Sequence, residues 1–126
     1  MTMNTDVVIL LSSGDGDGGA KATLAFSLGA TFLTVGRRTS VFLALDGCVW
    51  ASVCAPLHLA RPGWKTVGDY MEAVTGLNGR IVHCAVCEAG FDADDRECAS
   101  IRNGVTSGTL LDIVAAVQGG AEVISI

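Results

Sequence analysis

The chain has 126 residues, a length that fits one compact domain, so we expect residues 1–126 to form a single domain. Half of its residues are apolar, 17% are charged and the mean hydropathy is +0.50, which is more apolar surface than a small monomer hides, and a homo-oligomer is therefore expected. The formal net charge of -5, with eight scattered Lys and Arg residues, argues against a nucleic-acid partner or an anionic membrane surface.

The N-terminal segment MTMNTD has neither a basic region nor a long apolar stretch, and the apolar run that follows is too short to cross a bilayer. These features predict a cytoplasmic protein. That run, residues 7–11, consists of β-branched and aliphatic residues and predicts a strand buried on both faces. After a glycine-rich loop, residues 21–35 carry apolar side chains at spacings of three and four, which predicts a helix that ends at Gly36.

Residues 41–45 repeat the buried-strand pattern and stop at Asp46 and Gly47, which completes a β-α-β unit. Residues 48–65 predict a short helix and a loop. Thr66, followed three residues later by Asp69, predicts a helix cap, and that helix should run through Val74 and end near Gly76 or Gly79.

The C-terminal half continues the alternation of strands and helices. Residues 80–85 predict a third strand, residues 92–102 a solvated helix, and residues 123–126 a last buried strand. Residues 109–118 predict a helix whose inward side would carry Leu110, Leu111, Val114 and Val117. The predicted fold class is α/β, with three α/β/α layers around a mainly parallel sheet of four or five strands.

In such sheets, ligands bind beyond the carboxyl ends of the strands, where three of the predicted loops meet. These loops are residues 12–19, Asp46 with Gly47, and residues 84–90. We therefore expect the functional site at this edge.

The first loop has the spacing G-x-G-x-x-G at Gly14, Gly16 and Gly19, which is typical of dinucleotide binding. Two acidic residues, Asp15 and Asp17, would lie where a pyrophosphate has to bind, and the chain is too short for a separate substrate domain. The alternative of a calcium loop lacks the closing glutamate. The favoured interpretation is a flexible turn that borders a neighbouring site, and no cofactor is expected.

The five cysteines are an odd number in a chain without a predicted export signal, so free thiols are expected rather than disulfides. Cys84 and Cys87 form a C-x-x-C pair where a strand gives way to a helical turn, whose unpaired N–H groups favour a thiolate. A thiolate attacks disulfides and persulfides, carries sulfane sulfur and binds soft metals. Cys84 is the favoured nucleophile and Cys87 the assisting thiol; the alternative is that both are small buried apolar residues.

A zinc site would need a second close ligand pair beside Cys84 and Cys87, and the remaining candidates are poorly spaced for one: Cys48, Cys54, His58 and Cys98. No metal is therefore expected, and Cys98 is interpreted as an unreactive surface or packing thiol. His83 should point to the opposite face of its strand from Cys84 and is interpreted as a structural residue with satisfied hydrogen bonds.

Several segments together resemble the DsrE/DsrF-like proteins, small α/β domains of the YchN-like fold that include bacterial sulfur-relay subunits. They include VVILLSSGDGD, VFLALDGC and HCAVCEAG, and the similarity covers nearly the whole chain. The resemblance implies a homo-oligomer, a trimer or hexamer, in which Cys84 accepts sulfur as a persulfide and passes it to a partner protein. The site would be lined by Ser13, Gly14, Asp15, Asp46, Gly47 and Glu88.

The sequence thus predicts a small cytoplasmic DsrE-like protein that carries sulfur or performs thiol-redox chemistry through Cys84 and Cys87. Two alternatives remain open. One is a regulatory oligomer that binds a metal or a small ligand, and the other is a non-catalytic structural subunit.

Overall fold

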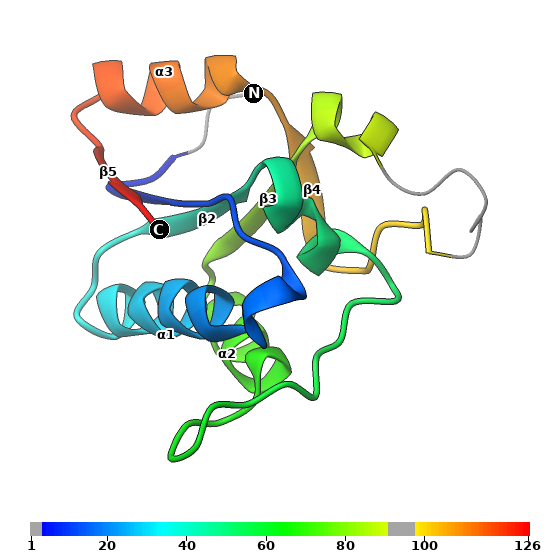
Figure 1. The fold of residues 1–126 in the computed structure, drawn as a ribbon. Helices are drawn as coiled ribbons and strands as arrows, with labels where there is room; N and C mark the ends of the chain where they lie inside the picture. The colour runs from blue at the N-terminus through cyan, green and yellow to red at the C-terminus, as the bar shows by residue number, and fades with distance from the viewer. Residues whose placement is uncertain (1–3, 91–97) are drawn as a thin grey trace.

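The computed structural model describes residues 4–90 and 98–126. One five-stranded sheet forms its centre, with the strand order β4-β3-β2-β1-β5 (Figure 1). Every neighbouring pair of strands runs parallel. The strands are β1 (Val7–Leu11), β2 (Thr39–Leu43), β3 (Arg80–Cys84), β4 (Val105–Gly108) and β5 (Glu122–Ser125). The predicted α/β class with a mainly parallel sheet is confirmed.

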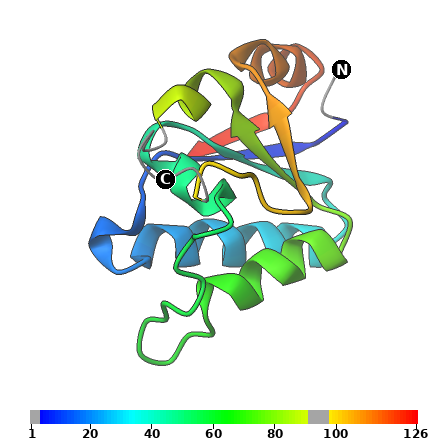
Figure 2. The same ribbon diagram turned by 90° about the vertical axis from the view of Figure 1, so that its right-hand side faces the viewer.

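Three layers are visible when the sheet is viewed along its edge (Figures 1 and 2). Helices α1 (Ala20–Thr34) and α2 (Val67–Gly76) cover one face, and α3 (Leu110–Gln118) covers the other. The central strands β1 and β2 are almost completely buried, which explains their unbroken apolar sequences. Alternate residues serve the two cores: Ile9 packs with Phe26 on the side of α1, whereas Val8 packs with Phe42 on the side of α3.

Local signals predicted the helix boundaries well. The Thr66 hydroxyl accepts a hydrogen bond from the Asp69 N–H, and the Asp69 carboxylate accepts one from the Thr66 N–H, so the predicted cap is a complete capping box. Helix α2 ends at Gly76, one of the two predicted positions. Because these signals depend on residues three apart in sequence, they can be recognised without the tertiary structure.

Several predictions about the C-terminal half were wrong. The last strand, predicted to be buried at residues 123–126, is the edge strand β5, and none of its residues is buried. Residues 98–102 do not form a helix; they form turns and an antiparallel bridge between Ser52 and Ile101. The rest of that predicted helix, residues 92–97, lies outside the described residues. Strand β4 was not predicted, because it is an edge strand in which Thr106 and Ser107 are exposed and polar.

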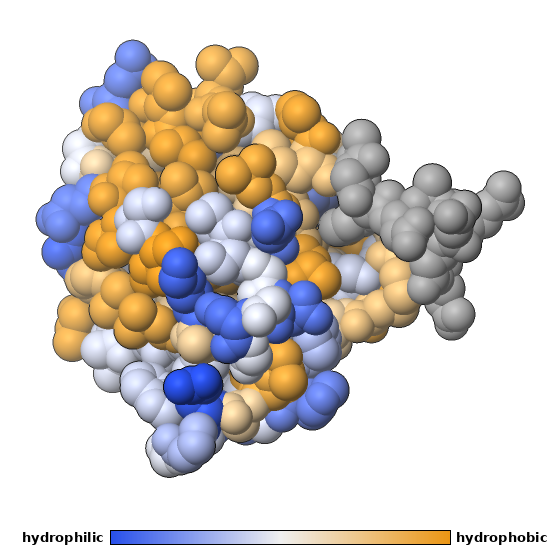
Figure 3. All heavy atoms as spheres, in the orientation of Figure 1, coloured by the Kyte–Doolittle hydropathy of each residue, from blue (hydrophilic) through white to orange (hydrophobic). Residues whose placement is uncertain are grey.

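The apolar side of α3 faces solvent, which overturns the predicted inward packing. Its four large apolar side chains are between 49% and 76% exposed: Leu110, Leu111, Val114 and Val117. Ala116 is the buried residue of this helix, and Ile113 packs beside it. Periodicity correctly identified an apolar face, but it cannot tell whether the sheet or another molecule covers that face. Figure 3 shows the apolar surface that results around α3. Within the described residues, no helix is long and apolar enough to cross a membrane.

Candidate functional site

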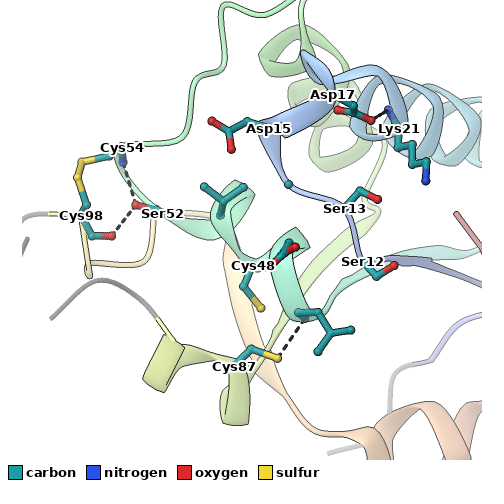
Figure 4. Close-up of a pocket in the computed structure, with 15 residues that line it drawn as sticks. Ser12, Ser13, Asp15, Asp17, Lys21, Cys48, Ser52, Cys54, Cys87 and Cys98 are labelled. Carbon is teal, nitrogen blue, oxygen red and sulfur yellow. Dashed lines mark hydrogen bonds between the residues drawn. A yellow bond between two sulfur atoms is a disulfide. The ribbon is translucent and has the colours of Figure 1, made fainter.

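A pocket of about 980 Å³ lies where the loops after β1, β2 and β3 meet (Figure 4). The glycine loop contributes residues 12–17, and the 3₁₀ segment η2 (Leu45–Ala51) contributes Leu45, Asp46, Cys48 and Val49. The lining is completed by Lys21, Ser52, Cys54, Cys87 and Cys98. The pocket is therefore at the carboxyl edge of the parallel sheet, where ligands bind in this class of fold.

The predicted site residues are only partly brought together. Ser13, Gly14, Asp15 and Asp46 line the pocket, and so does Cys87. Cys84 does not line it and is 5% exposed. Gly47 lies beneath the lining residues, and the side chain of Glu88 lies outside the described part of the chain.

Cys87 lies at the centre of a cluster of three thiols. It belongs to the 3₁₀ segment η3 (Ala85–Gly90), and its Sγ accepts a hydrogen bond from the Leu45 N–H at 3.2 Å. The thiols of Cys84 and Cys48 also hydrogen-bond to it. Burial raises the pKa of Cys87, but these three donors together outweigh it and hold its pKa below the ordinary value, which favours the thiolate.

Cys48 behaves in the opposite way. It is 3% exposed, and burial, followed by its hydrogen bond to Cys87, raises its pKa to about 12. Its Sγ also lies 3.5 Å from the Leu43 carbonyl oxygen. Cys48 therefore stays neutral near pH 7, and its S–H group can donate a hydrogen bond to Cys87 Sγ. From the sequence, Cys48 is only a potential zinc ligand, because its closeness to Cys87 depends on how η2 packs against β3.

The donor to Cys87 has an unusual backbone. Leu45 has a φ of 53°, in the left-handed region that residues with a Cβ seldom adopt, and its side chain is 72% exposed. Such conformations cost about 1–3 kcal/mol and concentrate at functional sites. Here the conformation accompanies the hydrogen bond from the Leu45 N–H to Cys87 Sγ. The predicted source of the N–H group was the helical turn after β3, but the observed one is the neighbouring loop.

Two glycines allow the glycine loop and η2 to pack closely. A Cβ at Gly47 would overlap the carbonyl oxygen of Leu11, and a Cβ at Gly14 would lie 2.9 Å from the carbonyl oxygen of Asp46. Either substitution would push the two walls of the pocket apart. The loop is fastened further by the Trp50 indole N–H, which donates to the Ser13 carbonyl oxygen at 3.2 Å.

The glycine loop does not leave the start of α1 open to an anion. One carboxylate oxygen of Asp17 accepts hydrogen bonds from the main-chain N–H groups of Gly19 and Ala20 at 3.0 and 3.2 Å. The other oxygen accepts one from the main-chain N–H of Lys21 at 3.0 Å. Those N–H groups are the ones that a bound phosphate would use. The geometry therefore favours a loop that borders the thiol cluster over one that holds a nucleotide.

Cys54 and Cys98 form a disulfide, which corrects two expectations at once. The sequence predicted free thiols and an unreactive Cys98 thiol, but only Cys48, Cys84 and Cys87 are free. The two half-cystines are 44 residues apart, so their pairing depends on tertiary packing. The disulfide also removes Cys54 and Cys98 from the six candidate zinc ligands. Residues 4–90 and 98–126 contain no group of three or more Cys, His, Asp or Glu side chains arranged to hold a metal ion.

His83 departs from its prediction as well. It is 3% exposed, but its Nδ1 has no hydrogen-bond partner among the described residues, so its polar atoms are not fully satisfied. It alternates along β3 with Cys84, and Ile81 on its side of the strand packs with the α1 and α2 core. His83 therefore lies on the other face of the sheet from the Cys84 side chain.

The layer order, the parallel sheet and the pocket at its carboxyl edge define the protein as a three-layer α/β protein with a thiol cluster at the strand ends. Similar solved structures identify the fold more closely. The YchN protein from E. coli superposes with a TM-score of 0.69 and 18% sequence identity, over 96% of this chain and 99% of that one. A protein of unknown function from Bacteroides thetaiotaomicron, BT1422, gives a TM-score of 0.56 and 14% identity over 96% and 95% of the two chains.

The chain therefore has the YchN-like, DsrE-like fold that the sequence resemblance predicted. No protein-family model matches the sequence, and no curated protein matches it significantly.

Proposed function

We propose that the protein is a cytoplasmic sulfur carrier that accepts sulfane sulfur on Cys87 as a persulfide, with Cys84 and Cys48 as assisting thiols. The observation that carries the proposal is the hydrogen bond from the Leu45 N–H to Cys87 Sγ, at a sulfur that lines the pocket. Sulfur carriage needs a thiol that is anionic near neutral pH, partly shielded and yet reachable by a donor. Cys87 has a lowered pKa and lines the pocket, whereas Cys84 is buried, so Cys87 is the better candidate of the two.

The loading step is a thiol–disulfide type of exchange. The Cys87 thiolate attacks the terminal sulfur of a donor persulfide, a new S–S bond forms on Cys87 Sγ, and the S–S bond of the donor breaks. The donor leaves as a thiolate and takes a proton from water. The thiols of Cys84 and Cys48, which hydrogen-bond to Cys87 before the reaction, stabilise its anionic form for the attack.

A homo-oligomer, a trimer or hexamer, is part of the same proposal. The apolar side chains of α3 are half or more exposed at several positions, and Val123 of β5 is 41% exposed. A second copy that covers this surface would remove it from water. The start of β5, with Val123, lies at the opposite ends of the strands from the pocket, so covering that part of the surface leaves the pocket open to a sulfur-accepting partner protein.

Intact-mass measurement after incubation with inorganic polysulfide tests the carrier proposal. We expect one added sulfur atom per chain, released by a reducing thiol, and no addition in Cys87→Ser. Cys84→Ala and Cys48→Ala should still load, but more slowly at neutral pH. The double variant Cys54→Ser/Cys98→Ser controls for sulfur bound at the disulfide and should load normally. Loading that persists in Cys87→Ser and disappears in Cys84→Ala would assign the role to Cys84 instead.

A further inference from the structure

The Cys54–Cys98 disulfide is exposed to the same pocket as the thiol cluster. Cys54 is exposed and Cys98 is partly exposed, and both line the pocket (Figure 4). Disulfides that serve only stability resist reduction, whereas exposed ones are more often labile, regulatory or catalytic. In a cytoplasmic protein, as proposed above, a disulfide is usually transient and has a catalytic or redox-sensing role.

The chain around the disulfide is held together without the S–S bond. The Val53 N–H donates to the Ser100 carbonyl oxygen at 3.0 Å, and the Arg102 N–H donates to the Ala51 carbonyl oxygen at 2.9 Å. The Ser52 hydroxyl accepts from the Cys54 N–H at 3.1 Å and donates to the Cys98 carbonyl oxygen. None of these bonds involves sulfur. The wall of the pocket can therefore keep its shape when the disulfide opens, as a disulfide that cycles between two redox states requires.

The charges around the pocket select among small thiols. Among the described residues that line it, three carry carboxylates, namely Asp15, Asp17 and Asp46, and one, Lys21, carries an ammonium group. A cleft with an excess of one sign raises the local concentration of ligands with the opposite charge and lowers that of ligands with the same charge. Cationic and neutral thiols are therefore favoured over anionic ones.

We propose that Cys54 and Cys98 form a second reactive site of the pocket, a dithiol/disulfide pair that exchanges with low-molecular-weight cationic or neutral thiols. The inference deepens the proposed function and rests on it, because it takes the sulfur donor to Cys87 to be the persulfide of such a small thiol. When that persulfide transfers its sulfur to Cys87, the free small thiol is released into the pocket, whose wall carries the disulfide.

The exchange is balanced without any further oxidant. A small thiolate attacks Cys54 Sγ, the more exposed sulfur; a mixed disulfide forms on Cys54 and the Cys98 thiolate leaves and takes a proton. A second thiolate attacks the mixed disulfide and releases the small disulfide. Two small thiols are oxidised, and the Cys54–Cys98 pair is reduced to two thiols.

Three thiols of similar size and different charge test the proposal: cysteamine, 2-mercaptoethanol and 3-mercaptopropionate. Each is added to the native protein without oxygen at equal thiolate concentration, and the newly formed thiols are alkylated and located by mass spectrometry. We expect both Cys54 and Cys98 to be alkylated while the circular dichroism spectrum stays native. The rate should fall from cysteamine to 2-mercaptoethanol to 3-mercaptopropionate, by on the order of tenfold from the cation to the anion at low salt. High salt should reduce that difference.

The Cys87→Ser variant separates this site from the carrier site. It should lose polysulfide loading and keep the exchange at Cys54 and Cys98. The Cys54→Ser/Cys98→Ser variant should keep polysulfide loading at Cys87 and lose the exchange with small thiols. The inference is overturned if the disulfide opens only in denaturant, if its reduction abolishes the native spectrum, or if the exchange needs Cys87. Equal rates for the three thiols would overturn the assigned substrate class.

Discussion

Leu45 and Cys87 are 42 residues apart in sequence, but the N–H of the first donates a hydrogen bond to the sulfur of the second at 3.2 Å. The contact joins the loop after β2 to the segment after β3, two strands that are neighbours in the sheet. It makes the reactivity of one cysteine depend on the main-chain conformation of another segment.

The alkylation rate of Cys87 by iodoacetamide should reach half of its maximum at a pH below the free-thiol value of about 8.5, because the Leu45 N–H and two thiols stabilise its thiolate. Cys84→Ala and Cys48→Ala each remove one donor, so each should move this midpoint to higher pH. The rate for each cysteine is measured by mass spectrometry of digests. A midpoint that neither variant moves would show that the neighbouring thiols do not act on Cys87.

The stability of the protein should fall more steeply at alkaline pH than that of Cys48→Ala. The native protein retains the Cys48 proton up to a pKa of about 12, whereas the unfolded chain loses it above about pH 8.5. Between these values the unfolded state binds fewer protons, so rising pH favours unfolding, by up to about 1.4 kcal/mol per pH unit from this group. Urea unfolding of both proteins across that range gives the difference. Parallel curves would contradict the raised pKa.

Gly47→Ala should destabilise the fold by roughly 1–3 kcal/mol or more, because the added methyl group would overlap the carbonyl oxygen at the end of β1. Gly16→Ala is the matched control in the same pocket. A Cβ at Gly16 would have no atom within 4 Å, so Gly16→Ala should change the free energy of unfolding little. Urea unfolding midpoints compare the two variants. Equal midpoints would show that η2 moves away from β1 at no cost.

Leu111→Lys should shift the protein toward the monomer without lowering the stability of the fold, because Leu111 is 76% exposed within one chain. Val8→Ala is the opposite control: Val8 is fully buried, so its truncation should lower stability without a direct effect on association. Sedimentation velocity gives the assembly state of each variant, and thermal unfolding of Leu111→Lys is measured at a concentration where it is monomeric. An unchanged assembly in Leu111→Lys would place the subunit contact on another surface.

The sequence predicted those parts of the fold that depend on near neighbours along the chain. The apolar runs at β1 and β2 and the cap at Thr66 are local signals, and each marked its element to within about two residues. Strand β4 was not predicted because an edge strand has little apolar pattern to detect. The exposure of the apolar face of α3 was not predicted because periodicity does not say what lies opposite such a face.

A pocket lies at the edge of the sheet where the sequence predicts a site, but the arrangement of its thiols could not be derived from the C-x-x-C motif alone. Cys87 lines the pocket and Cys84 is buried. Which of the two thiols reaches the pocket depends on how the η3 turn packs after β3. Cys48 joins the cluster from another loop, and Cys54 pairs with Cys98 across 44 residues. Contacts between distant segments of this kind leave no regular spacing in the sequence.

The three free cysteines come from η2, β3 and η3, and helix α2 separates the first from the other two along the chain, so the three sulfurs meet when β2 and β3 pair in register. Until then, each sulfur is an ordinary thiol in a solvated chain. In an unfolded chain these sulfurs therefore lack the hydrogen bonds that lower the pKa of Cys87, and its thiolate is favoured only after folding.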